Sequence, residues 1–222
     1  MILRGDEIRI VLFDLDGTLV DSAPDLIVAM RALRAELGEP DLDLSAVGAV
    51  VSKGGRAMLR QGFPGAEEAR IEALLPRFLD LYSTSIATHS KLFAGIEEVL
   101  SGLDAKDLPW GIVTNKPGWL ARSLVSAFAL DRRCASLVAG DCLAQRKPDP
   151  EPILHACKLA QCDARYCVYV GDDARDIEAG QKAQTMTVAA AWGYLDGDDA
   201  HTWGADLVVQ SPAQLLPALG LS

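Results

Sequence analysis

The sequence predicts an α/β fold, in which a Rossmann-like parallel sheet is covered by helices and an all-helical cap is inserted after the first strand. From residue 92 onward, short apolar runs alternate with amphipathic helical segments, which is typical of a parallel sheet with helices on both faces. Before that point, one apolar run beginning at Ile10 is followed by a block, 21–90, with a helical rhythm throughout. The chain has 222 residues, half of them apolar, enough for one core plus a small satellite domain.

The first segment, 10–19, ends an apolar strand with two carboxylates and a glycine. Asp14 and Asp16 project to the same side if the strand continues through them, and Gly17 lets the chain turn sharply beside them. Paired carboxylates at a strand end can share a divalent cation or divide acid and base roles. An Asp-Gly pair on its own would more often be a turn.

The block 21–90 is expected to be helical. Leucine and methionine side chains recur on one side of 21–37, and the pattern stops at Gly38. Further helices are expected at 44–51, 54–61, 66–75 and 78–87. We therefore assign 21–90 to the cap, and 1–20 together with 91–222 to the catalytic core.

The second half of the chain predicts the rest of the sheet and its helices. Strands are expected at 110–114, 137–139, 167–170, 186–190 and 207–209. Helices are expected at 96–103, 119–127, 150–160, 174–183 and 212–219. In open parallel sheets, ligands bind beyond the carboxyl ends of the strands, so the residues that follow each strand are the candidate site.

Composition limits the classes of partner. With 21 Lys and Arg against 31 Asp and Glu, the net charge is −10, which argues against a nucleic-acid or anionic-membrane surface. The five cysteines lack CxxC spacing, so neither a disulfide framework nor a zinc site is indicated. No signal peptide or membrane-spanning run is evident. We expect a cytoplasmic monomer or homodimer that acts on a small molecule.

Four motifs follow predicted strands in order along the chain. They are Asp14-Leu15-Asp16-Gly17-Thr18, Val113-Thr114-Asn115-Lys116, Arg146-Lys147-Pro148-Asp149-Pro150 and Gly171-Asp172-Asp173-Ala174-Arg175-Asp176. Each alone is weak, but together they closely resemble the haloacid dehalogenase superfamily, in its phosphatase branch with a small helical cap. The resemblance covers nearly the whole chain.

The resemblance implies roles for the core residues. Asp14 would be the nucleophile that forms an aspartyl-phosphate, and Asp16 would protonate the leaving group and then deprotonate water. Thr114 and Asn115 would donate hydrogen bonds to phosphoryl oxygens. Lys147 would neutralise charge on the phosphate and on Asp14.

The resemblance also implies Mg²⁺, held by Asp14, the Asp16 backbone carbonyl, Asp172 and waters. An anionic nucleophile that meets an anionic phosphate needs such a cation between them. Asp176 is expected to order metal-bound water or the lysine. Asp173 could share that role or only cap the next helix.

Substrate specificity is expected to come from the cap, where Lys53 and Arg56 flank two glycines before a helix and could bind an anionic group. A solvated turn is the plainer interpretation. The segments 51–58, 89–93 and 201–206 are similar to those of N-acetylmuramic acid 6-phosphate phosphatases, so this carboxylate-bearing phosphomonoester is the preferred substrate. Phosphoglycolate phosphatase is the alternative, and 2-phosphoglycolate also carries a carboxylate.

Three other functions on the same fold compete with this interpretation. A haloacid dehalogenase has no need of Asp16 or Mg²⁺, so the intact pair of aspartates disfavours it. A sugar phosphomutase would keep both aspartates but return the phosphoryl group to sugar. A non-catalytic scaffold would be expected to have lost a catalytic residue, and none is lost.

Overall fold

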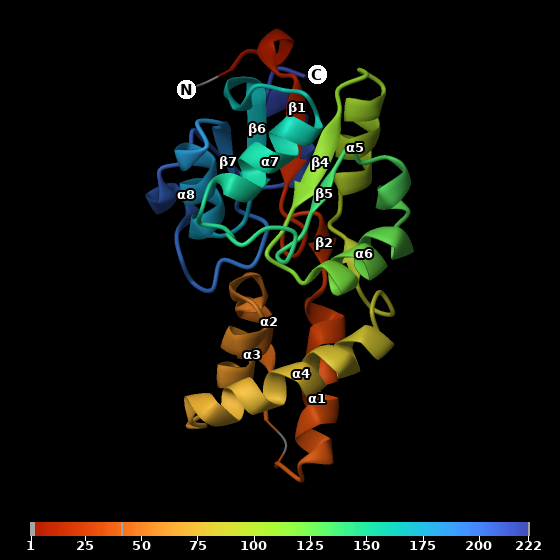
Figure 1. The fold of residues 1–222 in the computed structure, drawn as a ribbon, viewed down its shortest axis with the longest axis vertical. Coiled ribbons are helices and arrows are strands. Elements are labelled where there is room, and N and C mark those ends of the chain that lie inside the picture. Colours follow the sequence, from red (N-terminus) through yellow and green to blue (C-terminus); the bar gives the residue numbers. More distant parts are fainter. Residues whose placement is uncertain (1–2, 41, 222) are drawn as a thin grey trace.

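The computed structural model describes residues 3–40 and 42–221. Residues 1, 2 and 222 of the predicted core and residue 41 of the predicted cap lie outside the described residues. The described chain forms a six-stranded parallel sheet flanked by helices, with a separate group of helices at one end of the sheet (Figure 1). The first and last described segments of the chain lie at the opposite end. The predicted α/β fold class is confirmed.

The strands follow the order β5-β4-β1-β6-β7-β8, and each neighbouring pair is parallel. Their bounds are β1 Ile10–Phe13, β4 Trp110–Val113, β5 Leu137–Val138, β6 Cys167–Gly171, β7 Met186–Ala190 and β8 Leu207–Val209. The apolar strand β1 pairs with β4 on one side and β6 on the other, and it is buried on both faces. The sheet thus extends from β1 through β4 and β5 on one side and through β6, β7 and β8 on the other, which brings the ends of β1, β4 and β6 together.

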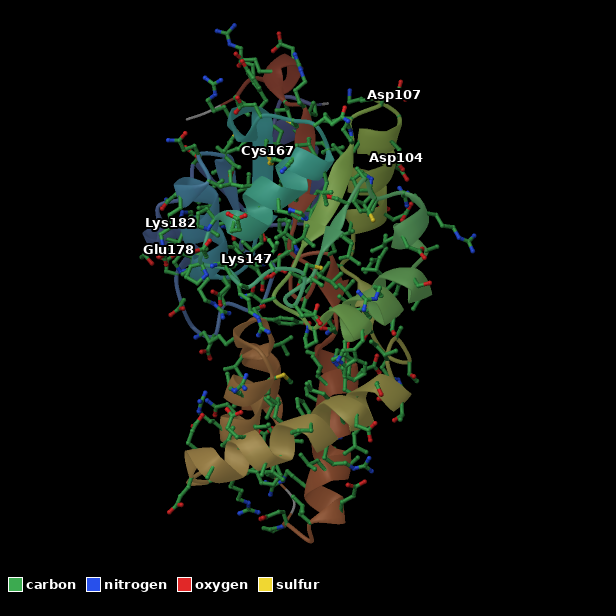
Figure 2. The ribbon with its side chains drawn as sticks, in the orientation of Figure 1. Asp104, Asp107, Lys147, Cys167, Glu178 and Lys182 are labelled. Atoms are coloured by element: carbon green, nitrogen blue, oxygen red, sulfur yellow. The ribbon has the colours of Figure 1, made fainter. Side chains whose placement is uncertain are left out.

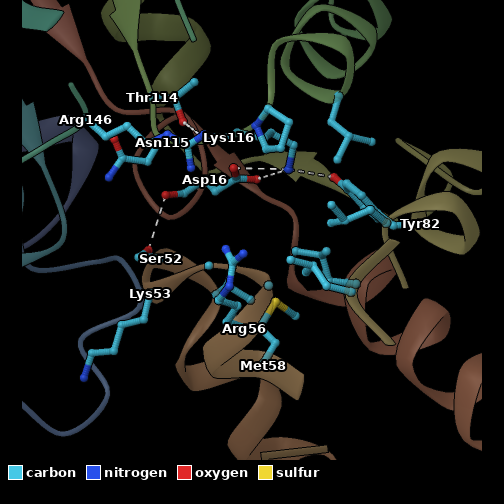
Figure 3. A pocket seen from close by; sticks show the side chains of 18 of the residues that line it. Asp16, Ser52, Lys53, Arg56, Met58, Tyr82, Thr114, Asn115, Lys116 and Arg146 are labelled. Carbon is cyan, nitrogen blue, oxygen red and sulfur yellow. Dashed lines mark hydrogen bonds and ion pairs between the residues drawn. The ribbon is translucent and has the colours of Figure 1, made fainter. Parts of the chain in front are cut away.

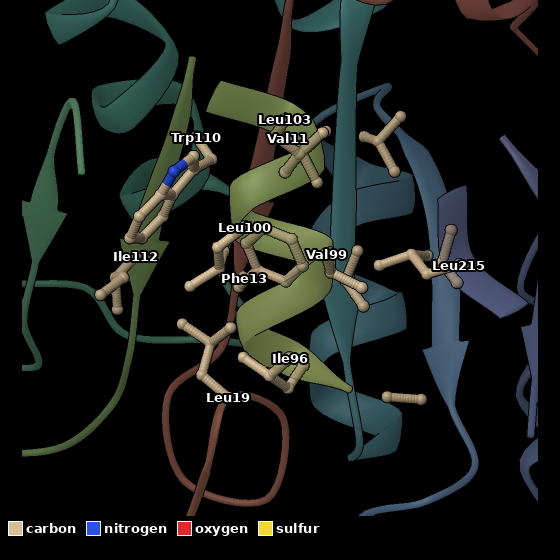
Figure 4. Packing of buried hydrophobic residues seen from close by; sticks show 14 of the residues in the cluster. Val11, Phe13, Leu19, Ile96, Val99, Leu100, Leu103, Trp110, Ile112 and Leu215 are labelled. Carbon is tan, nitrogen blue, oxygen red and sulfur yellow. The ribbon is translucent and has the colours of Figure 1, made fainter. Parts of the chain in front are cut away.

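Alternate residues of β1 supply two separate cores. Val11 and Phe13 face α5, whose Leu100 and Leu103 pack on them (Figure 4). The helices on this face are α5 Ile96–Asp104, α6 Gly118–Ala127 and α9 Leu215–Ala218. Ile10 packs in the core on the opposite face, under α7 Glu151–Leu159 and α8 Ala174–Lys182. This strict alternation is the period of two that a strand imposes.

A second group of helices lies beyond the carboxyl ends of the strands. It comprises α1 Ala23–Glu36, α2 Ser45–Ala49, α3 Gly55–Gly62 and α4 Glu68–Thr84, which we call the helical region. Leu26, Met30 and Leu33 of α1 lie in an apolar core of its own, together with Phe78 of α4 and with Leu120 from α6 of the sheet region. Short 3-10 helices occur at Gly5–Glu7, Val51–Lys53, Leu130–Arg132, Ala164–Tyr166, Ala200–Trp203 and Pro212–Gln214.

The expectation of two helices at 66–75 and 78–87 is wrong, because α4 runs continuously through Pro76. Proline in a helix interior costs about 3 kcal/mol. Ile71, on one side of it, and Tyr82, on the other, are both fully buried. Packing of this continuous apolar face outweighs the missing hydrogen bond.

The expected helix at 21–37 also begins later than predicted. Val20–Asp21 forms strand β2, which pairs antiparallel with β3, Lys91–Leu92. This two-stranded ribbon joins the points where the chain enters and leaves the helical region. The remaining predicted strands and helices occur within one or two residues of their expected bounds, except that 212–219 splits into a 3-10 turn and α9.

Candidate active site

A cavity of about 350 Å³ lies between the carboxyl ends of the strands and the helical region (Figure 3). Its core wall carries Asp14, Asp16, Thr114, Asn115 and Lys147, and its opposite wall includes Ser52, Lys53 and Arg56. These residues come from segments far apart in the sequence. The structure therefore brings most of the predicted site residues to one place.

Asp14 follows the last residue of β1 and is buried. Its backbone N–H donates to the Val170 carbonyl of β6 at 2.9 Å, which fixes the chain as it leaves the sheet. The Leu15 N–H donates to the Asp14 carboxylate at 2.7 Å. Burial raises the pKa of Asp14; Lys147 opposes the shift and Asp176 adds to it.

Lys147 is buried and its ammonium Nζ is surrounded by acceptors. It lies 3.0 Å from Asp14 and 2.7 Å from Asp176, and it donates to the Val113 carbonyl at 3.0 Å and the Tyr169 hydroxyl at 2.9 Å. Figure 2 shows it inside the molecule. Burial alone would lower the pKa of Lys147, but attraction to the two carboxylates raises it above the usual value.

Asp16 does not share the surroundings of Asp14, because β1 ends at Phe13 and the expected strand alternation stops there. The Ser22 hydroxyl donates to its carboxylate at 2.5 Å, and the Lys116 ammonium lies 2.9 Å away. Lys116 also donates to the Tyr82 hydroxyl at 3.2 Å. The Asp16 side chain is thus fixed between the sheet region and α4.

Asp172 follows β6 and is fully buried. The Thr18 hydroxyl donates to it at 2.8 Å and the Tyr194 N–H at 2.9 Å. Burial raises the pKa of Asp172, and repulsion from Asp14 and Asp176 raises it further.

Asp14, Asp172 and Asp176 form a cluster whose ligand atoms all lie within 4.8 Å of one another. The Lys147 ammonium contacts Asp14 and Asp176 of this set, and burial raises the pKa of Asp14 and of Asp172. Carboxylate oxygens are the donors that hard divalent cations prefer, so these residues fit Mg²⁺. The side chain of Asp16 is not in the cluster.

Gly17 shapes this cluster. Its φ is +84°, and a Cβ at this position would lie 2.0 Å from the Asp172 carboxylate. The sharp turn predicted after Asp16 therefore requires glycine for two reasons. The backbone at this position is left-handed, and it passes close to the buried Asp172 carboxylate.

Thr114 and Asn115 line the cavity directly after β4. The Thr114 hydroxyl accepts the Lys116 N–H at 3.2 Å. The Asn115 side chain is bonded both ways to the backbone of Lys147, donating at 2.9 Å and accepting at 3.0 Å. Asn115 therefore holds the loop that carries Lys147 against β4.

Asp173 caps α8 by accepting the Arg175 N–H at 2.9 Å, and a role for it beside the metal stays a prediction. It also binds the Arg175 guanidinium at 2.8 Å, and Arg175 donates to the Ser52 carbonyl of the helical region at 2.6 Å. Asp176 completes a capping box with Asp173 and contacts Lys147. The expected neighbour of the lysine is thus in place.

Lys53 and Arg56 line the cavity but are already paired. Lys53 forms an ion pair with Asp196 of the sheet region. Arg56 is bound bidentately by Glu72 of α4, with one contact at 2.9 Å. Any contact of these cations with a substrate requires an exchange of partners.

Four further residues of this site were not assigned from the sequence. Lys116 and Arg175 lie within two of the four motifs, so the charge of these side chains was a signal that could have found them. Ser52 directly precedes Lys53, which is followed by the glycine pair. Tyr82 gives no sequence signal beyond its place on the apolar face of a helix.

Relatives with assigned names cover nearly the whole chain. Phosphoglycolate phosphatase of Xanthomonas campestris pv. campestris (strain 8004) is 48% identical over 208 residues, which cover 93% of this chain and 94% of that protein. N-acetylmuramic acid 6-phosphate phosphatase of Pseudomonas putida is 44% identical over 210 residues, which cover 94% of each.

Solved structures share the fold. A crystal structure from Haemophilus somnus 129pt, described as a predicted phosphoglycolate phosphatase, has a TM-score of 0.85 at 24% identity and covers 95% of this chain and 97% of that one. A hydrolase from Pseudomonas syringae has a TM-score of 0.71 at 26% identity, with 93% and 95% covered. The family model described as haloacid dehalogenase-like hydrolase matches residues 11–190. The resemblance found in the motifs is confirmed: this chain belongs to the haloacid dehalogenase-like hydrolase family.

Proposed function

We propose that this hydrolase is a Mg²⁺-dependent phosphatase that cleaves a small carboxylate-bearing phosphomonoester through an aspartyl-phosphate on Asp14. The observation that carries the proposal is the position of Asp14. Its carboxylate lies in the cavity wall, 3.0 Å from the Lys147 ammonium and within a cluster of metal-ligating carboxylates. Residues 21–90 would act as the cap that selects the substrate.

In the first step, an Asp14 oxygen attacks phosphorus and the bond from phosphorus to the ester oxygen breaks. Asp16, held by Ser22 and Lys116, gives its proton to the leaving alkoxide. Thr114 and Asn115 line the same wall and would donate hydrogen bonds to the phosphoryl oxygens.

In the second step, Asp16 takes a proton from a water molecule, which attacks phosphorus. The bond between phosphorus and the Asp14 oxygen breaks, and inorganic phosphate leaves. Lys147 keeps its contact with Asp14 and limits the charge that builds up around the nucleophile. One carboxyl thus serves as acid and then as base.

We assign the metal to Asp14, the Asp16 carbonyl and Asp172, with Asp176 beside them. Bound Mg²⁺ would neutralise phosphate charge and orient the phosphoryl group towards the nucleophile. The Ser52 hydroxyl donates to Asp172 at 2.7 Å, and its oxygen also lies 3.4 Å from the Asp16 carbonyl, which supports the grouping of these two oxygens.

The preferred substrate is N-acetylmuramic acid 6-phosphate. The cap side of the cavity is largely apolar, with Val51, Met58, Leu75, Phe78 and Leu79 in its wall. A volume near 350 Å³ lies within the range of about 300–1,000 Å³ that holds ligands larger than a two-carbon acid. An apolar wall suits the faces of a sugar ring and an acetyl methyl group. Lys53 and Arg56 stay proposed contacts for the substrate on the cap wall, each after an exchange of its present partner.

Phosphoglycolate phosphatase is the alternative, favoured by the 48% identity to the Xanthomonas protein of that name. Its substrate is also an anionic phosphomonoester, so the same core residues would act on it.

A phosphate-release assay over a panel of phosphomonoesters tests the proposal. The panel contains N-acetylmuramic acid 6-phosphate, 2-phosphoglycolate and p-nitrophenyl phosphate, each with Mg²⁺. The expected result is the highest kcat/KM on N-acetylmuramic acid 6-phosphate. A higher value on 2-phosphoglycolate would select the alternative, and no phosphate release from any ester would refute a phosphatase.

A further inference from the structure

We propose that Arg146 is the residue that binds the substrate carboxylate. This inference rests on the proposed phosphatase function and names the group that recognises the leaving part of the substrate. Arg146 directly precedes Lys147 in the chain and lines the cavity. The resemblance to the family gives a role to Lys147 and none to Arg146.

The charged partners of the other cations support this choice. Six Lys and Arg side chains line the cavity within the described residues: Lys53, Arg56, Lys116, Arg146, Lys147 and Arg175. Five of them form ion pairs, with Asp196, Glu72, Asp16, Asp14 and Asp173 respectively in chain order. Within residues 3–40 and 42–221, the Arg146 side chain has no such partner, and it is exposed.

The ion pairs of the other five cations determine how much free energy a new anion can gain by binding each of the six. A substrate carboxylate that binds Arg56 must displace Glu72, so one ion pair replaces another and little free energy is gained. A carboxylate that binds Arg146 displaces only water. The planar guanidinium also offers two parallel N–H donors to a carboxylate.

The backbone of Arg146 is well placed for this role. Asn115 bonds both ways to the backbone of the next residue, Lys147, and the Lys147 ammonium contacts the nucleophile. The Arg146 side chain therefore extends from the end of the cavity where the phosphate is proposed to bind. Figure 3 shows it beside Asn115 on the core wall, opposite Lys53 and Arg56 of the cap.

The cavity also needs a free cation. A carboxylate entering it meets Asp14 and Asp16 on the core wall, and the chain as a whole carries a charge of −10. An arginine without an internal partner offsets this repulsion at the rim and gives a carboxylate-bearing ester an advantage over a neutral one.

The test compares two esters with the same phosphate and sugar. N-acetylmuramic acid 6-phosphate carries the lactyl carboxylate, and N-acetylglucosamine 6-phosphate lacks it. We measure the ratio of their kcat/KM values in the native chain and in Arg146→Ala, Arg146→Lys and Arg56→Ala. The ratio is expected to fall about tenfold in Arg146→Ala, mainly through KM for the carboxylate ester, and to recover partly in Arg146→Lys.

The controls distinguish failure of the Arg146 assignment from failure of the proposed phosphatase function. Arg56→Ala is expected to change the ratio less than threefold; an effect equal to that of Arg146→Ala would overturn the assignment. An unchanged ratio in Arg146→Ala would overturn it as well. If 2-phosphoglycolate is the better substrate, we measure instead the ratio of kcat/KM for 2-phosphoglycolate to kcat/KM for ethyl phosphate, which lacks the carboxylate.

If the native chain releases no phosphate from any ester, the proposed function itself has failed. Arg146→Gln replaces Arg146→Ala if thermal unfolding shows that the alanine variant is not folded.

Discussion

The Ser52 hydroxyl of the helical region donates a hydrogen bond of 2.7 Å to the carboxylate of Asp172 in the sheet region, across 120 positions of sequence. The Ser52 carbonyl accepts from Arg175 at 2.6 Å, so the residue is held from both sides. A residue of the proposed cap thus touches the proposed metal site directly. In the proposed function, this contact would join substrate selection to catalysis.

Ser52→Ala is therefore expected to lower kcat/KM by about tenfold, because a hydrogen bond to a charged group is worth about 1.5–3 kcal/mol and part of this is replaced by water. Steady-state phosphate release measures the loss. Ser45→Ala is the matched control, since Ser45 is an exposed residue of the same region whose hydroxyl donates to nearby Asp43. Equal activity in the two variants would contradict a role for the Ser52 contact.

Replacing the proposed nucleophile by Asp14→Asn should reduce phosphate release by a thousandfold or more, since an amide oxygen is a poor nucleophile. The fold should persist, because asparagine fills the same space. Circular dichroism and an assay at high enzyme concentration check both statements. A folded variant with normal turnover would refute the aspartyl-phosphate route.

Asp16→Ala should lower kcat by about 10²–10⁴-fold, the usual contribution of a general acid or base. The loss should be smaller with p-nitrophenyl phosphate, whose leaving group needs little protonation, than with an alkyl phosphate. Parallel kcat measurements on the two esters test this. The same loss on both would argue that Asp16 acts only on the attacking water.

Lys147→Ala should destabilise the fold as well as abolish activity. Removing one partner of a buried ion pair costs about 3–5 kcal/mol, and here it leaves Asp14 and Asp176 without their ammonium. Urea unfolding in the absence of metal measures the change. Lys182→Ala is the control, because its i,i+4 pair with Glu178 lies on the exposed side of α8 (Figure 2) and contributes little. A similar midpoint for both variants would contradict the buried cluster.

The buried carboxylates predict how stability depends on pH when EDTA removes metal. The pKa of Asp14 is raised from 3.8 to about 7 and that of Asp172 to about 8. The folded chain therefore binds more protons than the unfolded chain between these values, so the free energy of unfolding should fall as pH rises from about 4 to about 8. Melting temperatures at pH 5 and pH 8 test the sign. Saturating Mg²⁺ should remove most of the loss at pH 8, and Asp172→Asn should flatten the profile.

The motif residues were predictable because topology leaves little freedom in where they meet. Asp14, Thr114 and Asp172 each follow a strand of a parallel sheet, and the carboxyl ends of neighbouring parallel strands lie at one edge. The roles that they share with the family then followed from four short motifs. Lys147 was also expected directly after a strand, but a loop separates it from the end of β5 at Val138.

The helical region was harder to predict, because local patterns there compete with packing. Pro76 indicated a break between two helices, yet burial of Ile71 and Tyr82 on one face keeps α4 continuous. The direction of Asp16 was also beyond the sequence. Its neighbours alternate like a strand, but the chain leaves the sheet at Phe13 and Asp16 turns to Lys116.

By itself, the sequence determined the fold class, the family and the core residues of the candidate site, because apolar periodicity and motif spacing are local properties of the chain. Only the tertiary structure decided which cations are already engaged. Lys53 meets Asp196 across 143 positions, while Arg146 is left facing the cavity. Ion pairs of this kind depend on which surfaces come together when the helical region packs against the sheet, and no local pattern encodes that choice.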